Sequence, residues 1–157
     1  MKKFMKILAP TDLSELCCSG LRYALELARE QSAEIVVLHV IPVSEGWFSS
    51  REENGPVRDL MAKEQVALDQ FLQDHFSESL NLVEIRQKIE VGTPSSNIVE
   101  MAEREEVDLI VMSTHGRTGL KHMLMGSVTE KVIARAHCPV LSIPALAHRK
   151  EDAAKAA

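Results

Sequence analysis

The chain has 157 residues, and its 18 Lys and Arg against 23 Asp and Glu give a net charge of −5. Apolar types make up 45% and charged types 26% of the residues, which excludes a disordered chain and suits one domain with an ordinary core. The negative charge and the lack of a basic run argue against nucleic acid as a ligand. No apolar run approaches the roughly 18 residues of a membrane span, and no signal peptide is recognisable, so we expect a soluble, cytoplasmic protein without a membrane partner.

The first half of the chain alternates strand and helix patterns. A short apolar run predicts a strand over 6–10, and apolar residues at helical spacing predict a helix over 17–28. A run rich in β-branched residues predicts a strand over 34–41, and periodic Leu and Phe residues predict a helix over 60–76. Between these two, the segment 42–56 holds Gly, Pro, Ser and the only Trp, which predicts an irregular excursion over the surface.

The second half continues the alternation. Apolar and polar residues alternate strictly over 83–91, which predicts a strand with one solvent-exposed face. Thr93 and Pro94 then suit the N-cap and the first position of a helix that runs to about residue 105. The remaining elements are, in chain order, a buried strand over 107–112, a helix over 127–136, a short strand over 139–144 and a polar, Ala-rich tail over 146–157.

Five strands separated by helices predict a doubly wound α/β fold, with a five-stranded parallel sheet, helices on both faces and a Rossmann-like topology. Continuous apolar strands belong at the centre of such a sheet and alternating or Pro-containing strands at its edges, which predicts the order 3-2-1-4-5. Residues 1–145 would form this one domain, and 146–157 a flexible C-terminal tail. Because the order reverses between the first and fourth strands, we expect a ligand site after Ala9 and Met112, beyond their carboxyl ends.

Asp12 follows the first strand and admits two interpretations. Its carboxylate is placed to accept hydrogen bonds from ribose hydroxyls or an exocyclic amine, as acidic residues do in nucleotide-binding folds. It is also suited to cap the next helix, because Glu15 follows three residues later at the spacing of a capping box. The sequence leaves both roles open, and the two can coexist.

The loop after the fourth strand, residues 113–127, has the chemistry of a phosphate site. It holds three Gly, Arg117, Lys121 and two His, and it leads into a helix. Glycines let backbone N–H groups approach an anion, and a helix N-terminus presents unpaired donors and a partial positive charge. The alternative is a long loop before a helix capped by Ser127 and Glu130 in an S-x-x-E box. Walker and G-x-G-x-x-G motifs are absent, which argues against a P-loop NTPase or a dinucleotide enzyme.

Much of the chain resembles one known family. The segments KILAPTDLSE and IVVLHVI, and the stretch from VDLIVMSTHGRTG to CPVLSIP, resemble the universal stress protein family over nearly the whole chain to Pro144. The ATP-binding signature of that family is G-x2-G-x9-G-[ST], which this sequence matches at Gly116, Gly126 and Ser127. Ser113 stands where ATP-binding members have the first Gly, and a side chain there is expected to crowd a contact to the ribose or phosphates.

The resemblance implies an ATP site. No carboxylate pair lies near the loop in the sequence, so we expect any Mg²⁺ or Mn²⁺ to be held mainly by phosphate oxygens and not by the protein. The resemblance implies that Asp12 anchors the adenosine, that Val40 and Met112 pack on the base, and that the glycine loop and the last helix hold the phosphates. The expected site residues are Pro10, Thr11, Asp12, Val40, Met112, Ser113, His115, Gly116, Arg117, Gly119, Gly126, Ser127, Val128 and Thr129. The alternatives are core packing for Val40 and Met112 and a solvated first-turn position for Thr129.

The resemblance also implies a homodimer formed through the fifth strand. Independently, Val140, Leu141, Ser142 and Ile143 read as a short apolar edge strand, and such edges pair with another chain unless they are covered. Two lines of reasoning therefore predict the same interface.

Three functions remain open. We favour a homodimeric, ATP-binding regulatory protein of the stress response with at most slow hydrolysis. The second is a stress protein that binds no nucleotide and acts through protein contacts, to which Ser113 points. The third is a true ATPase, for which His115 and His122 are the loop candidates to orient water. His39, within the second strand, is most simply a hydrogen-bonded core residue.

Overall fold

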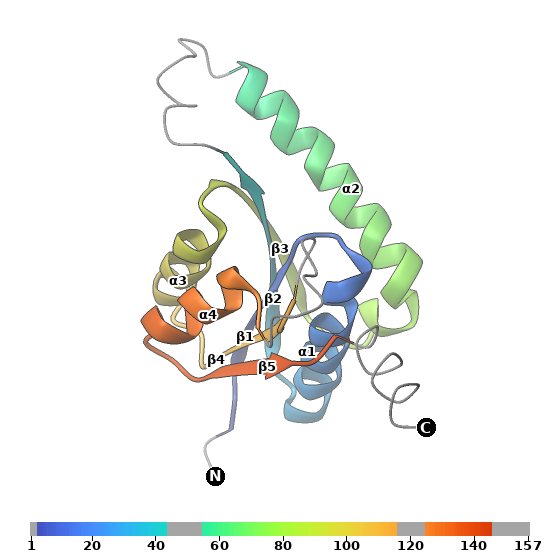
Figure 1. The fold of residues 1–157 in the computed structure, drawn as a ribbon. Helices are drawn as coiled ribbons and strands as arrows, with labels where there is room; N and C mark the ends of the chain where they lie inside the picture. The colour runs from blue at the N-terminus through green and yellow to red at the C-terminus, as the bar shows by residue number, and fades with distance from the viewer. Residues whose placement is uncertain (1–2, 44–54, 116–124, 146–157) are drawn as a thin grey trace, which may run out of the picture.

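A five-stranded parallel sheet forms the centre of the structure, a computed structural model described here over residues 3–43, 55–115 and 125–145 (Figure 1). Its strands are β1 (Lys6–Thr11), β2 (Glu34–Pro42), β3 (Ile85–Gly92), β4 (Leu109–Ser113) and β5 (Val140–Ile143). The order is β3-β2-β1-β4-β5 with every pair parallel, so the predicted doubly wound topology is confirmed. The two edge strands are only half-buried, whereas β4 is buried throughout, as their sequence patterns predicted.

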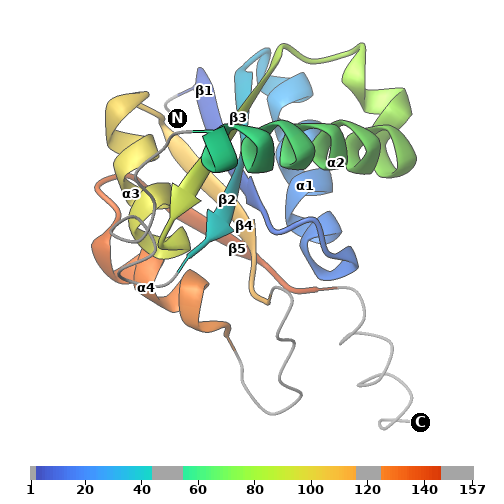
Figure 2. The ribbon, with the colours of Figure 1, turned by 90° about the horizontal axis from the view of Figure 1, so that it is seen from above.

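Helices cover both faces of the sheet (Figures 1 and 2). They are the short 3-10 helix η1 (Glu15–Cys17), α1 (Cys18–Gln31), α2 (Gly55–Leu80), α3 (Pro94–Arg104) and α4 (Ser127–Arg135). One buried cluster joins α1 and α2 to the sheet, and a second joins α3 and α4 to the opposite face. Because successive strand residues point to opposite faces, Ile7 and Ala9 of β1 enter the first cluster and Leu8 enters the second.

The start of α3 follows its sequence signals, whereas α2 is longer than its periodicity predicted. Thr93 is the N-cap of α3 in an extended conformation and Pro94 is the first helical residue, so both assignments are confirmed. The helix predicted over 60–76 extends over Gly55–Leu80, and its backbone departs from helical geometry at Phe76, where φ is −138°. The regular part therefore ends where the apolar period ends.

Both predicted capping boxes are wrong. Gly126, not Ser127, is the N-cap of α4, because its N–H is bound to the Thr114 carbonyl 2.6 Å away and the chain turns into the helix one residue earlier. Asp12 does not cap α1, because the 3-10 helix η1 intervenes and α1 begins only at Cys18. No helix in the described ranges has the length and apolarity that crossing a bilayer requires.

Candidate functional site

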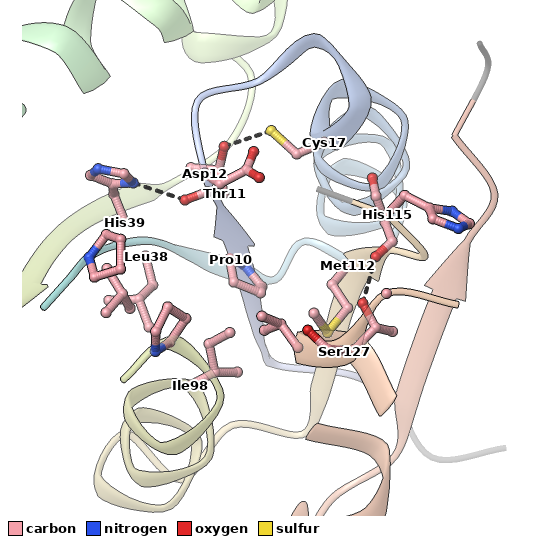
Figure 3. Close-up of a pocket in the computed structure, with 17 residues that line it drawn as sticks. Pro10, Thr11, Asp12, Cys17, Leu38, His39, Ile98, Met112, His115 and Ser127 are labelled. Atoms are coloured by element: carbon pink, nitrogen blue, oxygen red, sulfur yellow. Dashed lines mark hydrogen bonds between the residues drawn. The ribbon is translucent and has the colours of Figure 1, made fainter. Parts of the chain in front are cut away.

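A cavity of about 310 Å³ opens at the carboxyl ends of β1, β2 and β4, around the point where the strand order reverses (Figure 3). Open parallel sheets bind ligands at this position, and the volume lies at the lower end of the roughly 300–1,000 Å³ typical of ligand pockets. The turn after β1 and the starts of α3 and α4 complete its walls. The lining residues are Pro10, Thr11, Asp12, Cys17, Leu38, His39, Val40, Pro42, Pro94, Ile98, Met112, Ser113, His115, Gly126, Ser127, Val128 and Thr129.

The structure brings together all the expected site residues that fall within the described ranges, because each of them lines this cavity. Gly116, Arg117 and Gly119, expected along the phosphates, lie outside those ranges, as do Lys121 and His122. Sequence reasoning missed Cys17, Leu38, His39, Pro42, Pro94 and Ile98. Strand alternation could have found Leu38, which shares a face with Val40, but the rest are brought in by tertiary packing.

An apolar wall forms the α3 and α4 side of the cavity. It consists of Leu38, Val40, Ile98 and Met112, which also belong to the second buried cluster. Val40 and Met112 are only 7% and 6% exposed, so they pack in the core and border the cavity at the same time. A wall of this composition suits a flat, weakly polar ring.

The turn after β1 forms a polar corner of the cavity, held by its own side chains. Asp12 Oδ1 accepts a hydrogen bond from the Ser14 N–H at 3.0 Å and one from the Ser14 hydroxyl at 2.5 Å. Thr11 Oγ1 accepts a hydrogen bond from the Leu13 N–H at 3.1 Å, and Leu13 adopts a left-handed conformation with φ of 61°. Such local bonds stabilise a left-handed backbone conformation that a bulky aliphatic residue such as leucine would otherwise avoid. Asp12 is therefore a turn-forming residue whose carboxylate also borders the cavity.

Cys17 packs behind this corner as an unreactive thiol. Its Sγ lies 2.8 Å from Thr11 Oγ1 and donates to the Ser14 carbonyl at 2.9 Å. Burial is the main cause that raises the pKa of the Cys17 thiol, which keeps it protonated and poorly nucleophilic at neutral pH. Its part in the site is to hold the turn.

The start of α4 supplies backbone donors to the cavity. Gly126 at the N-cap position has no side chain and α4 has no side-chain cap, while Ser127, Val128 and Thr129 of its first turn line the cavity. Unpaired N–H groups and the helix dipole make such a helix end attractive to anions. Thr129 is 3% exposed and its hydroxyl donates to the Ser113 carbonyl at 2.9 Å, so the alternative of a solvated Thr129 is wrong.

Ser113 does not crowd the cavity with its hydroxyl. Its Oγ accepts a hydrogen bond from the Gly20 N–H at 3.0 Å and lies 3.2 Å from Ser19 Oγ, both on α1. Successive strand side chains point to opposite faces, so Ser113 turns toward α1 while Met112 turns to the cavity's apolar wall. The hydroxyl of Ser113 is therefore engaged by α1, and the effect of this serine on a bound nucleotide stays a prediction.

His115 lies at the edge of the cavity with its ring turned away from the other lining side chains (Figure 3). It is 8% exposed, and its Nδ1 lies 3.0 Å from Thr114 Oγ1. The described lining residues include no Lys or Arg, and the described chain contains no cluster of three acidic, His or Cys residues able to hold a metal. Within this part of the chain, an anion would be met by the α4 backbone.

Comparison with known proteins gives a consistent result. The sequence profile of the universal stress protein family matches residues 3–144. The universal stress protein MJ0531 of Methanocaldococcus jannaschii is 38% identical over 142 residues, covering 89% of this chain and 82% of its own length.

Solved structures show the same similarity. The solved structure of MJ0577 from the same organism is 32% identical to this chain and has a TM-score of 0.71. The match covers 91% of this chain and 97% of the MJ0577 chain. A universal stress protein from Archaeoglobus fulgidus in complex with dAMP has a TM-score of 0.62 at 23% identity, covering 90% of this chain and 99% of its own. The profile match, the identity to MJ0531 and the sheet order agree, and the chain belongs to the universal stress protein family.

Proposed function

We propose that the protein binds an adenine nucleotide, ATP foremost, in the cavity at the ends of β1 and β4. The observation that carries the proposal is the first turn of α4, which lacks a side-chain cap and borders a cavity whose other wall is apolar. A nucleotide requires both features, because its phosphates need donors and its base needs apolar surface. The relative from Archaeoglobus fulgidus that binds dAMP supports this proposal.

The residues present fit such a ligand. Val40 and Met112 would pack on the base. The Asp12 carboxylate would accept hydrogen bonds from the ribose hydroxyls or from the exocyclic amine of the base. The N–H groups at the start of α4, residues 127–129, would hold the phosphates, joined by the glycine loop that contains Arg117. A divalent ion, Mg²⁺ or Mn²⁺, would be held by phosphate oxygens and would neutralise their charge.

The biological role that this site favours is regulatory. ATP would act as a bound ligand in the stress response, with at most slow hydrolysis, because catalysis requires a group that positions the attacking water. His115 lines the cavity but turns its ring away from the other lining side chains (Figure 3), which supports binding over turnover at this histidine.

A substitution at Gly126 tests the site. A Cβ there would lie 3.0 Å from the Thr114 carbonyl oxygen, so Gly126→Ala requires a small shift and serves as the matched control for Gly126→Asp. We expect Gly126→Asp to abolish ATP binding in titration calorimetry, because it adds a negative charge at the phosphate position, while Gly126→Ala keeps measurable affinity. Equal ATP affinity of wild type and Gly126→Asp would refute the site. Phosphate release by the wild type well above that by Gly126→Asp would instead favour an ATPase.

We further propose a homodimer through β5. The carbonyls of Pro139 and Ile143 bind N–H groups of Ile110 and Thr114, so the alternate residues Val140 and Ser142 direct their backbone groups outward from the sheet edge. Ser142→Pro should remove an outward donor and leave the pairing with β4 intact. Analytical ultracentrifugation should then show a monomer for Ser142→Pro and a dimer for Ser142→Ala and the wild type. A monomeric wild type would refute the interface.

A further inference from the structure

One buried side chain beside the cavity has two hydrogen-bond partners on different elements. His39, in β2, is 2% exposed. Its Nδ1 lies 2.9 Å from the carbonyl oxygen of Thr11 at the end of β1, and its Nε2 lies 3.2 Å from Glu64 Oε2 on α2. Figure 3 shows the ring directed toward the Thr11 carbonyl and away from the apolar wall. The expected core histidine is thus a bridge between α2 and the turn that borders the cavity.

The two partners fix the ring of His39 from both sides. A carbonyl oxygen only accepts hydrogen bonds, so the Nδ1 of His39 carries a hydrogen. Nε2 faces the Glu64 carboxyl group, and the hydrogen bond between these two groups ties the ring to α2.

The bridge holds the peptide that begins the polar corner of the cavity. In a planar trans peptide the carbonyl and the following N–H point in opposite directions, so fixing the Thr11 carbonyl also fixes the plane of the Thr11–Asp12 peptide. The same Thr11 accepts the Leu13 N–H through Oγ1, and Asp12 follows directly. A change at His39 would therefore be transmitted to the Asp12 carboxylate without any contact between His39 and a ligand.

We propose that His39, held in place by Glu64, is a positioning residue for the nucleotide site. The proposal rests on the nucleotide binding proposed above. When the link between His39 and Glu64 is broken, the Thr11–Asp12 peptide is released and ligand affinity falls.

Glu64 is the acidic group in direct contact with Nε2 of His39. Arg22 instead stacks on Phe76, with 5.3 Å from its guanidinium carbon to the ring centroid. On β3 the residue opposite His39 is Ile89, whereas its neighbours Lys88 and Glu90 pair with Glu105 and Arg104.

Two substitutions at Glu64 separate the link to His39 from the carboxylate charge. In Glu64→Gln the side-chain amide N–H donates to Nε2, so the link survives without the charge. In Glu64→Ala the bridge is lost. Gln65→Ala is the matched control, because it breaks the neighbouring link between α2 and β3, from Gln65 Nε2 to Gln87 Oε1 at 2.7 Å, without touching His39.

The readout is the ATP dissociation constant measured by titration calorimetry, with ¹⁵N NMR of the His39 ring as the report on its hydrogen bonds. We expect Glu64→Ala to lose about tenfold in ATP affinity, as loss of one hydrogen bond implies. Glu64→Gln should keep the wild-type affinity and show the Nδ1–H tautomer, and Gln65→Ala should follow the wild type.

The outcomes separate this proposal from the proposed function. A Glu64→Ala variant that binds ATP as well as the wild type overturns the positioning role and leaves nucleotide binding standing. Equal losses in Gln65→Ala and Glu64→Ala also overturn it, because loosening of α2 would then explain both. A wild type that binds no ATP, while NMR shows the Nδ1–H tautomer of His39, refutes the proposed function and the positioning role with it.

Discussion

The backbone N–H of Gly20 donates a hydrogen bond of 3.0 Å to the side chain of Ser113, so a strand residue caps the first turn of a helix 93 positions earlier in the chain. The N-cap residue of α1, Cys17, makes no side-chain cap of its own. The first donors of a helix have no intrahelical partner, and a buried one is costly when it stays unpaired. The serine that replaces the family's first motif glycine therefore has a structural role in this chain.

Removal of the Ser113 hydroxyl should destabilise the fold and spare ligand binding. We expect Ser113→Ala to lower the free energy of unfolding by about 1–2 kcal/mol, because the buried Gly20 N–H loses its acceptor. Urea unfolding measures this, with Ser19→Ala as the control that removes the other hydroxyl and keeps the cap. The ATP dissociation constant should stay unchanged. A large loss of ATP affinity without loss of stability would show instead that the hydroxyl contacts the ligand.

Gly20 is required by the close approach of α1 to β4. A Cβ at this position would lie 2.5 Å from the backbone nitrogen of Ser113 and 2.8 Å from the carbonyl carbon of Met112. Alanine favours helices over glycine by about 1 kcal/mol, but displacement of α1 should outweigh this, and we expect Gly20→Ala to lose about 2 kcal/mol overall. The midpoint of urea unfolding reports the change. Adding Ser113→Gly should not restore stability, because it removes only the contact of 2.8 Å with Ser113 Oγ and leaves the two clashes with backbone atoms.

The two roles of Asp12 can be separated by a pair of substitutions. Asp12→Asn keeps an oxygen that accepts from Ser14 but removes the charge, whereas Asp12→Ala removes both. We expect Asp12→Asn to stay within about 0.5 kcal/mol of wild-type stability and to lose roughly tenfold in ATP affinity, since hydrogen bonds to charged acceptors are the stronger ones. Asp12→Ala should lose about 1 kcal/mol of stability as well. If Asp12→Asn binds ATP like the wild type, the carboxylate serves the turn alone.

An ionic cluster at the amino ends of the strands predicts how stability depends on pH. Arg86 donates to Glu105 at 2.5 Å and also pairs with Glu34, and this hydrogen bond is the main cause that lowers the pKa of Glu105 below its ordinary value. A lowered carboxyl pKa stabilises the fold above the unfolded value, and the contribution disappears as the pH falls through the folded value.

Glu105→Gln should therefore be less stable than wild type at neutral pH, by less than about 1 kcal/mol because the pair is partly solvated. The difference should shrink as the pH falls below the ordinary glutamate range, which urea titrations at several pH values would show. Glu100→Gln on the exposed side of the same helix is the control and should change little. A difference that persists in acid would exclude the ionic origin.

Sequence patterns predicted the architecture because the order of apolar and polar residues in each strand reflects which of its faces are buried. The continuous apolar run of β2 and the alternation of β3 distinguish a central from an edge strand, and the observed order follows from that difference. The loops that border the cavity could be located for the same reason, since the reversal point follows from the strand order. Capping was mispredicted at Ser127, because the bond between Gly126 and Thr114 is not encoded at helical spacing.

The sequence by itself determined the doubly wound sheet, the place of the cavity and the family, because periodicity and motif spacing are local properties of the chain. Only the tertiary structure decided that Ser113 turns its hydroxyl to Gly20 and that His39 joins Glu64 to the Thr11 carbonyl. These partners lie far apart in the sequence, and their geometry arises only when helices pack on the sheet. Side-chain direction and hydrogen-bond partners are therefore consequences of packing, which no local pattern records.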